Sequence, residues 1–266
     1  MKEKSLNLIY GLKEGRITHI FRVESGLECG CFCPACGDRL IAKKGDVVRH
    51  HFAHQSNVPC EYGVESALHL AAKEIIVAAD EIMIPEVRLQ FPHSYRPNIL
   101  IHECMKVKID HVELEKRLDN IIPDVVVYSG GKKFFIEIFV THAIDDKKRQ
   151  QIKTMDISTI EIDLSGCEEL PDEKELSEIL LGESPLKAWV YNAVEERLLQ
   201  KYIAASKKMK VINRGFAKHV DNCPKRKRIW NGKIYANAMD DCLGCDSLIA
   251  WEDMADYLFC IGNTVI

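Results

Sequence analysis

The fold rests on the segment Ile122-Pro-Asp-Val-Val-Val-Tyr128, followed by Ser129-Gly-Gly131 and Lys132-Lys-Phe-Phe-Ile-Glu-Ile-Phe-Val-Thr141. Both long runs are rich in β-branched and aromatic residues, and the Gly-Gly step between them is a turn signal, so the pattern predicts a β-hairpin. Asp124 opens the first strand and Glu137 lies within the second. Adjacent antiparallel strands can bring these two carboxylates to one edge of a sheet.

The residues around this hairpin predict a core with the order helix, three strands, helix, strand. Apolar residues recur with a period of 3.6 over residues 64–79, which indicates a buried helix face. We expect strands over 106–114, 122–128, 132–141 and 157–164, and helices over 145–155 and from Pro185 to about Lys208. The fold class is therefore α/β, or α+β with a mixed sheet.

Length and composition describe a globular protein. The chain has 266 residues, of which 47% are hydrophobic and 29% charged, and its formal net charge is -4. No stretch approaches the ~20 apolar residues of a membrane span. The N-terminal residues contain no apolar signal segment. We therefore expect a cytoplasmic protein with no membrane partner.

The cysteines are concentrated in two groups. Of eleven in the chain, five fall between Cys29 and Cys60 and four between Cys223 and Cys260. An odd number does not close a disulfide framework, and clustering of this kind is typical of metal sites. We expect two structural zinc sites, and hence three parts: a zinc-binding module over 1–63, a core over 64–183, and a helix with a zinc ribbon over 184–266.

The first zinc site is predicted from Cys33-Pro-Ala-Cys36 and His51-Phe-Ala-His54. Two pairs of ligands, Cys33 with Cys36 and His51 with His54, complete a closed tetrahedral Zn²⁺ site. Four neighbours are close enough in the sequence to substitute for one of them, namely Cys29, Cys31, His50 and Cys60.

The second zinc site is predicted from four cysteines with the spacing of a zinc ribbon that has one irregular turn. They are Cys223, Cys242, Cys245 and Cys260. His219 could replace one cysteine.

Charge is unevenly distributed along the chain. Between Lys201 and Lys233 there are eleven Lys or Arg residues and one acid, Asp221, whereas nine acids accompany one lysine between Glu161 and Glu183. The acidic stretch is equally well explained as a solvated surface. The tract Lys225-Arg226-Lys227-Arg228 directly follows a predicted zinc ligand, which favours contact with a polyanion.

Further polar residues precede the hairpin. Glu65, His69 and Lys73 are spaced i, i+4, i+8 and form a polar stripe on the first predicted helix. Carboxylate oxygens are ligands that Mg²⁺ prefers, so Asp124 and Glu137 could hold Mg²⁺ or Mn²⁺, with a carboxylate from this helix completing the site.

Taken together, these motifs resemble a known family on two levels. The α-β-β-β-α-β order with Pro-Asp and a later acid resembles the PD-(D/E)XK, or restriction-endonuclease-like, nuclease core. The Cys, His, Glu65-Ser-Ala-Leu-His69, Pro123-Asp124 and Glu137 motifs run in the order of the CoiA-like competence protein family. The resemblance implies metal binding at Asp124 and Glu137, with Glu65 as the helix acid and Glu113 as a further acid on the first strand.

The sequence departs from the nuclease pattern at one position. The lysine usual two residues after the second acid is replaced by Phe139, which cannot stabilise developing charge. A cation could instead come from the following helix, where Lys147 and Lys148 are candidates, or from His142.

The sequence thus predicts a metal-dependent nuclease that hydrolyses phosphodiester bonds of DNA, in DNA processing during competence or recombination, or in host defence. We favour DNA over RNA as the nucleic-acid partner, and protein partners in such a complex are compatible with the resemblance. The alternative is a catalytically inactive nuclease fold that serves as a zinc-stabilised nucleic-acid-binding or scaffolding module.

Overall fold

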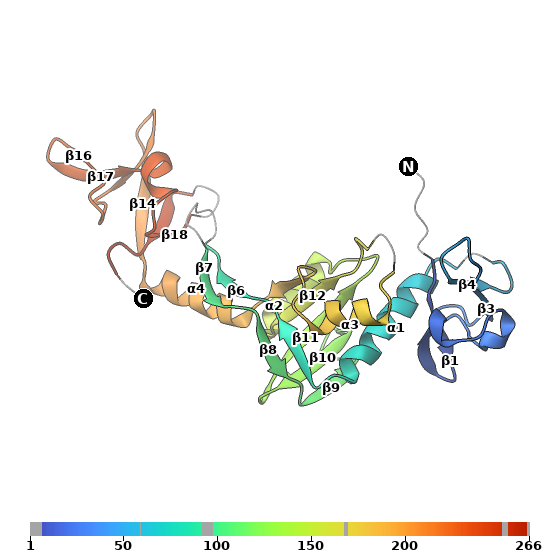
Figure 1. The fold of residues 1–266 in the computed structure, drawn as a ribbon. Helices are drawn as coiled ribbons and strands as arrows, with labels where there is room; N and C mark the ends of the chain where they lie inside the picture. The colour runs from blue at the N-terminus through green and yellow to red at the C-terminus, as the bar shows by residue number, and fades with distance from the viewer. Residues whose placement is uncertain (1–6, 59, 92–97, 168–169, 252–254, 265–266) are drawn as a thin grey trace. The chain divides into compact units, whose positions relative to one another are not determined.

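The protein has a mixed α/β architecture with several sheets (Figure 1). A computed structural model describes residues 7–58, 60–91, 98–167, 170–251 and 255–264. The chain divides into two compact units, one formed by Met1–Pro85 with Cys104–Tyr191 and the other by Glu86–Glu103 with Asn192–Ile266. The N-terminal module and the central core, expected as separate parts, therefore share one unit. Within the described residues, no helix combines the length and apolarity needed to cross a membrane.

A five-stranded sheet forms the centre of the first unit. Its strand order is β13-β12-β11-β10-β9. The strands span His111–Leu114 (β9), Val125–Ser129 (β10), Lys132–Phe139 (β11), Thr159–Asp163 (β12) and Lys187–Tyr191 (β13). The predicted hairpin is present as antiparallel β10 and β11, joined by Gly130 and Gly131, both with positive φ. That conformation costs glycine nothing and matches the twist of the strands.

Three helices cover this sheet. The helix α1 (Gly63–Val77) contacts α3 (Glu173–Leu181), and both contribute to one core with Val125, Val127 and Ile138 (Figure 1). The helix α2 (Asp146–Met155) connects the parallel strands β11 and β12, which a tight turn could not do. Successive residues of a strand point to opposite faces of the sheet, so Glu137 and Ile138 lie on different faces. Glu137 lies on the face where Lys148 of α2 contacts it.

The N-terminal module consists of two hairpins and two short 3-10 turns. Its strands are Tyr10–Lys13 (β1), Arg16–His19 (β2), Leu40–Lys43 (β3) and His51–His54 (β4), and its turns are Ile20–Arg22 and Leu27–Cys29. Its buried residues, including Ile9, Leu40 and Phe52, belong to the same apolar core as the residues of α1. The module is therefore part of the first unit and does not have a core of its own.

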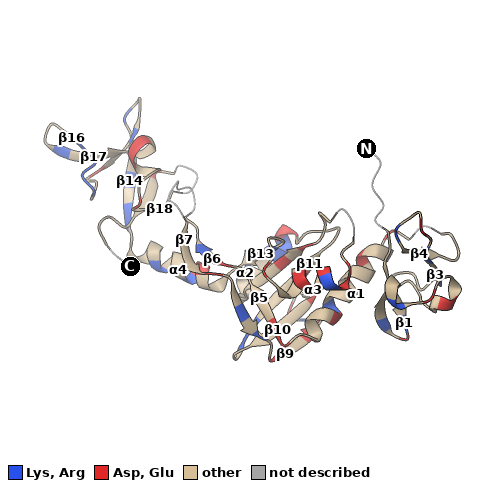
Figure 2. Ribbon diagram, viewed as in Figure 1, with Lys and Arg blue, Asp and Glu red and all other residues tan. Residues whose placement is uncertain are grey.

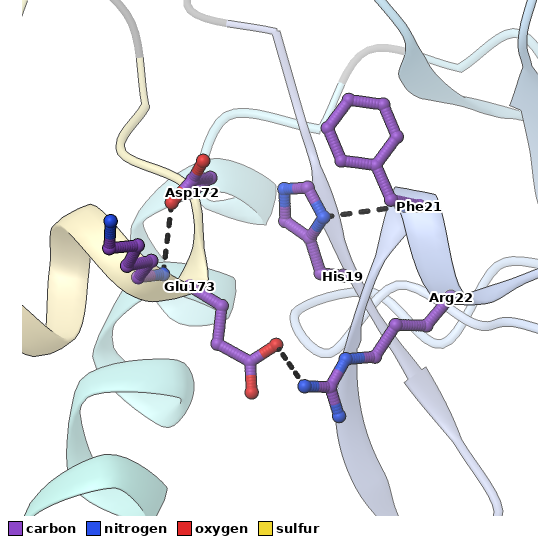
Figure 3. Close-up of a pocket in the computed structure, with 6 residues that line it drawn as sticks. His19, Phe21, Arg22, Asp172 and Glu173 are labelled. Atoms are coloured by element: carbon purple, nitrogen blue, oxygen red, sulfur yellow. Dashed lines mark hydrogen bonds and ion pairs between the residues drawn. The ribbon is translucent and has the colours of Figure 1, made fainter.

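A pocket of about 360 Å³ marks the contact between this module and the start of α3 (Figure 3). Its lining comprises His19, Phe21, Arg22, Asp172, Glu173 and Lys174. The exposed Arg22 guanidinium lies 2.7 Å from Glu173. Nearby, the buried Tyr10 hydroxyl donates a hydrogen bond of 2.9 Å to the carbonyl of Pro171. One buried and one exposed polar contact thus connect module and helix.

One prediction for the region after residue 160 was wrong. The long helix expected from Pro185 to Lys208 is interrupted, because residues 187–191 form β13 and the helix α4 spans only Ala193–Ala205. The Asn192 side chain caps α4 by accepting from the N–H groups of Val194 and Glu195. In the acidic stretch, for which a solvated surface was one of two open interpretations, Asp172 and Glu175 form a capping box that begins α3.

The second unit contains a six-stranded sheet of order β16-β17-β15-β14-β19-β18. Its strands span Lys207–Asn213 (β14), Lys218–Asp221 (β15), Arg228–Trp230 (β16), Lys233–Asn237 (β17), Leu248–Ala250 (β18) and Tyr257–Cys260 (β19), with a π-helical turn at Ala238–Cys242. A small sheet of β6 (Val87–Leu89) and β7 (Ile99–His102) packs with α4 in this unit. In the first unit, β5 (Glu81–Ile84) pairs with β8 (Met105–Lys108).

The two polar contacts between the N-terminal module and the start of α3, Tyr10 to Pro171 and Arg22 to Glu173, can be compared by mutation. Tyr10→Phe leaves the buried carbonyl of Pro171 without its donor and is expected to lower the free energy of unfolding by about 1 kcal/mol. Arg22→Gln removes an exposed ion pair and is expected to change it by less than about 0.5 kcal/mol. Urea denaturation of the two variants measures both effects, and an equal loss in both would contradict this ranking.

Candidate functional site

A candidate metal centre lies in the N-terminal module. Cys33, Cys36, His54 and Cys60 place one ligand atom each within 4.8 Å of all the others. Within the part of the chain that the structure describes, this group alone meets that criterion. The Sγ atoms of Cys33 and Cys60 are 3.8 Å apart. Ligands at Zn–S distances of ~2.3 Å around a tetrahedral ion lie at about this separation.

The local backbone explains how the ligands converge. The carbonyl of Cys33 accepts from Gly37, and the N–H of Cys33 donates to Asp38, so the Cys33–Cys36 pair lies on a closed turn. Gly37 has φ of 71°, a conformation that favours glycine. Gly63, the first residue of α1, allows close approach on the other side, because a Cβ there would lie 3.3 Å from the Cys60 Sγ and 3.4 Å from the Cys33 Sγ.

The chemistry of the four side chains fits a bound cation. Burial and contact with the other two thiols raise the pKa of Cys60 to about 11, because neighbouring thiolates repel. The Nε2 atom of His54 is buried and, within the described part of the chain, has no hydrogen-bond partner. A cation would stabilise the thiolates and use this nitrogen. The cluster could therefore hold a metal ion such as zinc.

The predicted ligands are brought together in part. Cys33, Cys36 and His54 lie in the cluster, but the fourth place belongs to Cys60 and not to His51. The Nδ1 of His51 lies 2.9 Å from the Arg49 carbonyl. His51 and His54 are three residues apart on β4, and residues separated by an odd number on a strand point to opposite faces.

The four cysteines of the second unit form a looser group. The pKa of Cys242 is raised to about 12 by burial and by the nearby thiols of Cys223, Cys245 and Cys260, so all four are within electrostatic reach. Turns follow two of them, since Arg226 donates to the Cys223 carbonyl and Cys245 to that of Cys242. The arrangement is compatible with a second metal site but does not have the close approach of the first cluster.

A candidate catalytic group lies where β10 begins beside α1. The carboxylate of Asp124 is 3.1 Å from the Lys73 Nζ and 3.6 Å from the His69 Nδ1, and it accepts 2.9 Å from the backbone N–H of Ile138. Burial raises the pKa of Asp124, but His69, Ile138 and Lys73 outweigh it and hold the pKa well below its usual value. Asp124 is therefore ionised.

Glu137 has the opposite electrostatic balance. Burial raises its pKa to about 7, despite the Lys148 ammonium 2.7 Å from Oε2. Its other oxygen, Oε1, is buried and has no hydrogen-bond partner among the residues that the structure describes. Lys148 extends from α2, whose N-terminus is capped by Asp145. The structure thus places Lys148, one of the two lysines expected to supply a cation from this helix, beside Glu137.

The remaining predicted residues divide into two sets. The Oε1 of Glu65 lies 3.9 Å from the Nδ1 of the exposed His142, so these two predicted residues lie beside each other. Glu113 is occupied elsewhere, since it accepts from Lys116 and from the hydroxyl of Tyr128. Lys147 lines a separate cavity of about 770 Å³ beside α2. Lys73, buried and paired with Asp124, was part of the predicted helix stripe but was not assigned to the site.

The basic tract of the second unit is only partly available to a polyanion. The Arg228 guanidinium makes hydrogen bonds to Asp241 and Asp240. Lys225 lies 3.9 Å from Asp246. Arg226 and Lys227 are exposed, and Arg226 has φ of 50° in the turn after Cys223. The tract's exposed charge therefore lies mainly on its two middle residues.

Comparison with known families gives one match. Residues 25–63 match the family model described as competence protein CoiA, N-terminal domain. The matched CoiA segment contains all four residues of the metal cluster and ends at the first residue of α1. It supports the resemblance to the CoiA-like family and contains none of the candidate catalytic carboxylates. Comparisons with curated proteins and with solved structures returned no match.

The ligand set of the CoiA segment can be tested by metal analysis. Cys60→Ser is expected to lower the zinc content of the purified protein by about one ion per chain, because it removes one of four ligands. His51→Ala is the matched control and should leave the zinc content unchanged. Elemental analysis after purification without chelators measures both, and loss of zinc in His51→Ala alone would restore the ligand set predicted from spacing.

The raised pKa of Glu137 predicts a pH-dependent effect on stability. Its folded pKa of about 7 exceeds the ordinary 4.5, so its contribution to stability is complete below pH 4.5 and is lost as the pH rises through 7. Glu137→Gln is therefore expected to raise the free energy of unfolding at pH 8 by about 1–3 kcal/mol. Asp124→Asn, whose pKa shift has the opposite sign, should lower it. Urea denaturation at pH 8 without added divalent ions distinguishes the two.

Proposed function

We propose that the protein is a metal-dependent nuclease that hydrolyses phosphodiester bonds of DNA. One observation carries this proposal: the Asp124 carboxylate accepts a hydrogen bond from the backbone N–H of Ile138, the residue after Glu137, and the Lys148 ammonium lies 2.7 Å from the Glu137 carboxylate. A pair of acids with a nearby cation is the combination that phosphodiester hydrolysis requires, because charge develops on the phosphate during attack.

The order of elements supports this reading. A helix, three antiparallel strands, a helix and a parallel strand follow one another as α1, β9, β10, β11, α2 and β12, with β5 to β8 inserted after α1. This order is similar to that of PD-(D/E)XK nucleases. Phe139 occupies the usual lysine position, and Lys148 provides an ammonium group from the next helix.

The residues present fit a divalent cation such as Mg²⁺. The donor atoms are carboxylate oxygens, and no described residue makes a hydrogen bond to the buried Oε1 of Glu137. Asp124 and Glu137 would hold the ion, with Glu65 contributing from α1. When bound, the ion would lower the pKa of a coordinated water and neutralise charge on the phosphate.

The other side chains have separable roles. Lys73 and His69 orient the carboxylate of Asp124 and keep it ionised. Lys148 orients Glu137 and can donate to a phosphate oxygen as negative charge develops there. His142, which is exposed beside Glu65, is available to exchange a proton with the leaving group or with water.

The match to the CoiA segment supports a role in DNA processing during competence or recombination, and host defence is a further setting in which such a nuclease acts. One observation favours the alternative of an inactive nucleic-acid-binding module. The Lys73 ammonium lies 3.1 Å from Asp124 and already neutralises a carboxylate that a metal ion would need. Metal-dependent cleavage distinguishes the two functions.

Substitutions at the carboxylates and lysines test the nuclease proposal. Asp124→Asn and Glu137→Gln are expected to reduce single-turnover cleavage of DNA in saturating Mg²⁺ or Mn²⁺ by about 100-fold or more. Lys148→Ala should cause a similar loss because its ammonium touches Glu137. Lys147→Ala, its neighbour on the same helix, should retain activity within about threefold.

Zinc content and circular dichroism serve as controls, since all four changes should leave both unaltered. Wild-type cleavage by Glu137→Gln would exclude the nuclease proposal and leave the binding module. Equal losses in the two lysine variants would exclude the specific role of Lys148.

A further inference from the structure

The six-stranded sheet of the second unit has one buried and one open face. Val211, Val220 and Ala236 are buried, and the first two belong to the apolar core of this unit. Directly opposed residues on neighbouring strands share a face, and successive residues along one strand point to opposite faces. The pairs Asp221–Tyr235, Arg228–Tyr235 and Trp230–Lys233 therefore lie on the open face.

This open face contains a cavity of about 540 Å³. Its lining residues are Arg214, His219, Asp221, Trp230, Lys233 and Tyr235. The rings of His219 and Tyr235 have centroids 5.0 Å apart, and the Trp230 side chain is 68% exposed. A tryptophan this exposed at a cavity offers a flat apolar surface to a ligand.

The segment that forms this face is rich in basic residues, of which Arg228 is paired with Asp240 and Asp241. Eleven Lys or Arg residues and one acid lie between Lys201 and Lys233, a local balance of +10 from eleven minus one. The single acid, Asp221, is paired with Arg214 at 2.7 Å. Figure 2 shows basic residues on β14 and β16. The ammonium group of Lys208, on β14, lies 4.4 Å from the centre of the Tyr257 ring, on β19.

Aromatic rings interleaved with cations distinguish among ligands. A duplex covers the flat faces of its bases, so it would contact the cations but could not stack on Trp230 or Tyr235. An unpaired base presents its π-face, and its flanking phosphates carry the charge that Lys233 complements. The volume lies within the ~300–1,000 Å³ usual for ligand pockets.

We propose that the open face of this sheet binds single-stranded nucleic acid, with an unpaired base stacked against Trp230 and Tyr235 and its phosphate near Lys233. The proposal rests on the proposed function only for the class of partner, and it adds a specific strand state and a site outside the catalytic group. Unpaired DNA and unpaired RNA share the chemistry that the cavity recognises.

The test is a binding titration that needs no cleavage. Full-length protein carrying Asp124→Asn is titrated into fluorescein-labelled oligo(dT), oligo(U) and duplex DNA of about fifteen nucleotides, without added divalent ions. Trp230→Ala in this background is expected to weaken binding of a single strand about tenfold, with less than a twofold change for the duplex. Trp230→Phe should restore most of the loss, because a ring is again available for stacking.

Ile229→Ala is the matched control. Ile229 adjoins Trp230 on β16, is 60% exposed and lies on the opposite face of the strand, so its loss should change affinity less than twofold. Lys233→Gln should reduce the salt dependence of single-strand binding by about 0.7 in the log–log slope.

The outcomes separate this proposal from the nuclease proposal. A Trp230-dependent affinity for either oligonucleotide supports the site. The ratio of the affinities for oligo(dT) and oligo(U) shows whether the site prefers DNA or RNA. Equal effects of Trp230→Ala and Ile229→Ala, or an equal loss for the duplex, would overturn it. A failure of the wild-type protein to cleave DNA would affect the nuclease proposal and leave this result intact.

Discussion

The ammonium group of Lys73 is the constraint on which the first unit depends, because a buried charge must be matched by nearby opposite charges. Its side chain is 7% exposed and lies 3.1 Å from Asp124 and 2.9 Å from Glu115. These pairs join α1 to the start of β10 and to the residue after β9. The interaction that positions the helix on the sheet is therefore the same one that keeps the central carboxylate ionised. Packing and candidate chemistry cannot vary independently at this position.

The cluster of Cys33, Cys36, His54 and Cys60, which could hold a metal ion, lies at the other end of α1. It gathers ligands from a turn, from the end of β4 and from Cys60, three residues before the helix begins. Small modules with few buried residues commonly depend on such a link. Spacing alone identified three of these ligands. It could not identify the fourth, because the choice between His51 and Cys60 depends on which face of a strand each residue occupies and on how the loop after β4 returns.

The elements of the central core could be predicted because their hydrophobic periodicity agrees with their packing, as in α1 and the β10–β11 hairpin. The sequence was less informative where a short strand adjoins a helix. Residues 187–191 include Trp189, Val190 and Tyr191, which favour strands, but these residues lead directly into the helical pattern of α4, and only their pairing with β12 at the edge of the sheet separates the two elements. Asp172 and Glu175 carried a capping-box signal that the surrounding charge concealed. The choice between Lys147 and Lys148 also required the structure, since adjacent helix residues point about 100° apart.

The second unit is assembled from two separate stretches of chain, and this has an evolutionary consequence. Leu89 and Phe91, from the excursion within the first unit's sequence, share an apolar cluster with Ile249 and Ile261 near the other end of the chain. Such a unit cannot be acquired or lost by a single fusion or truncation after Tyr191, because the whole β6–β7 sheet would remain behind without the apolar residues that pack on it. The two units are therefore expected to be inherited together, as one gene architecture, and not exchanged as independent cassettes.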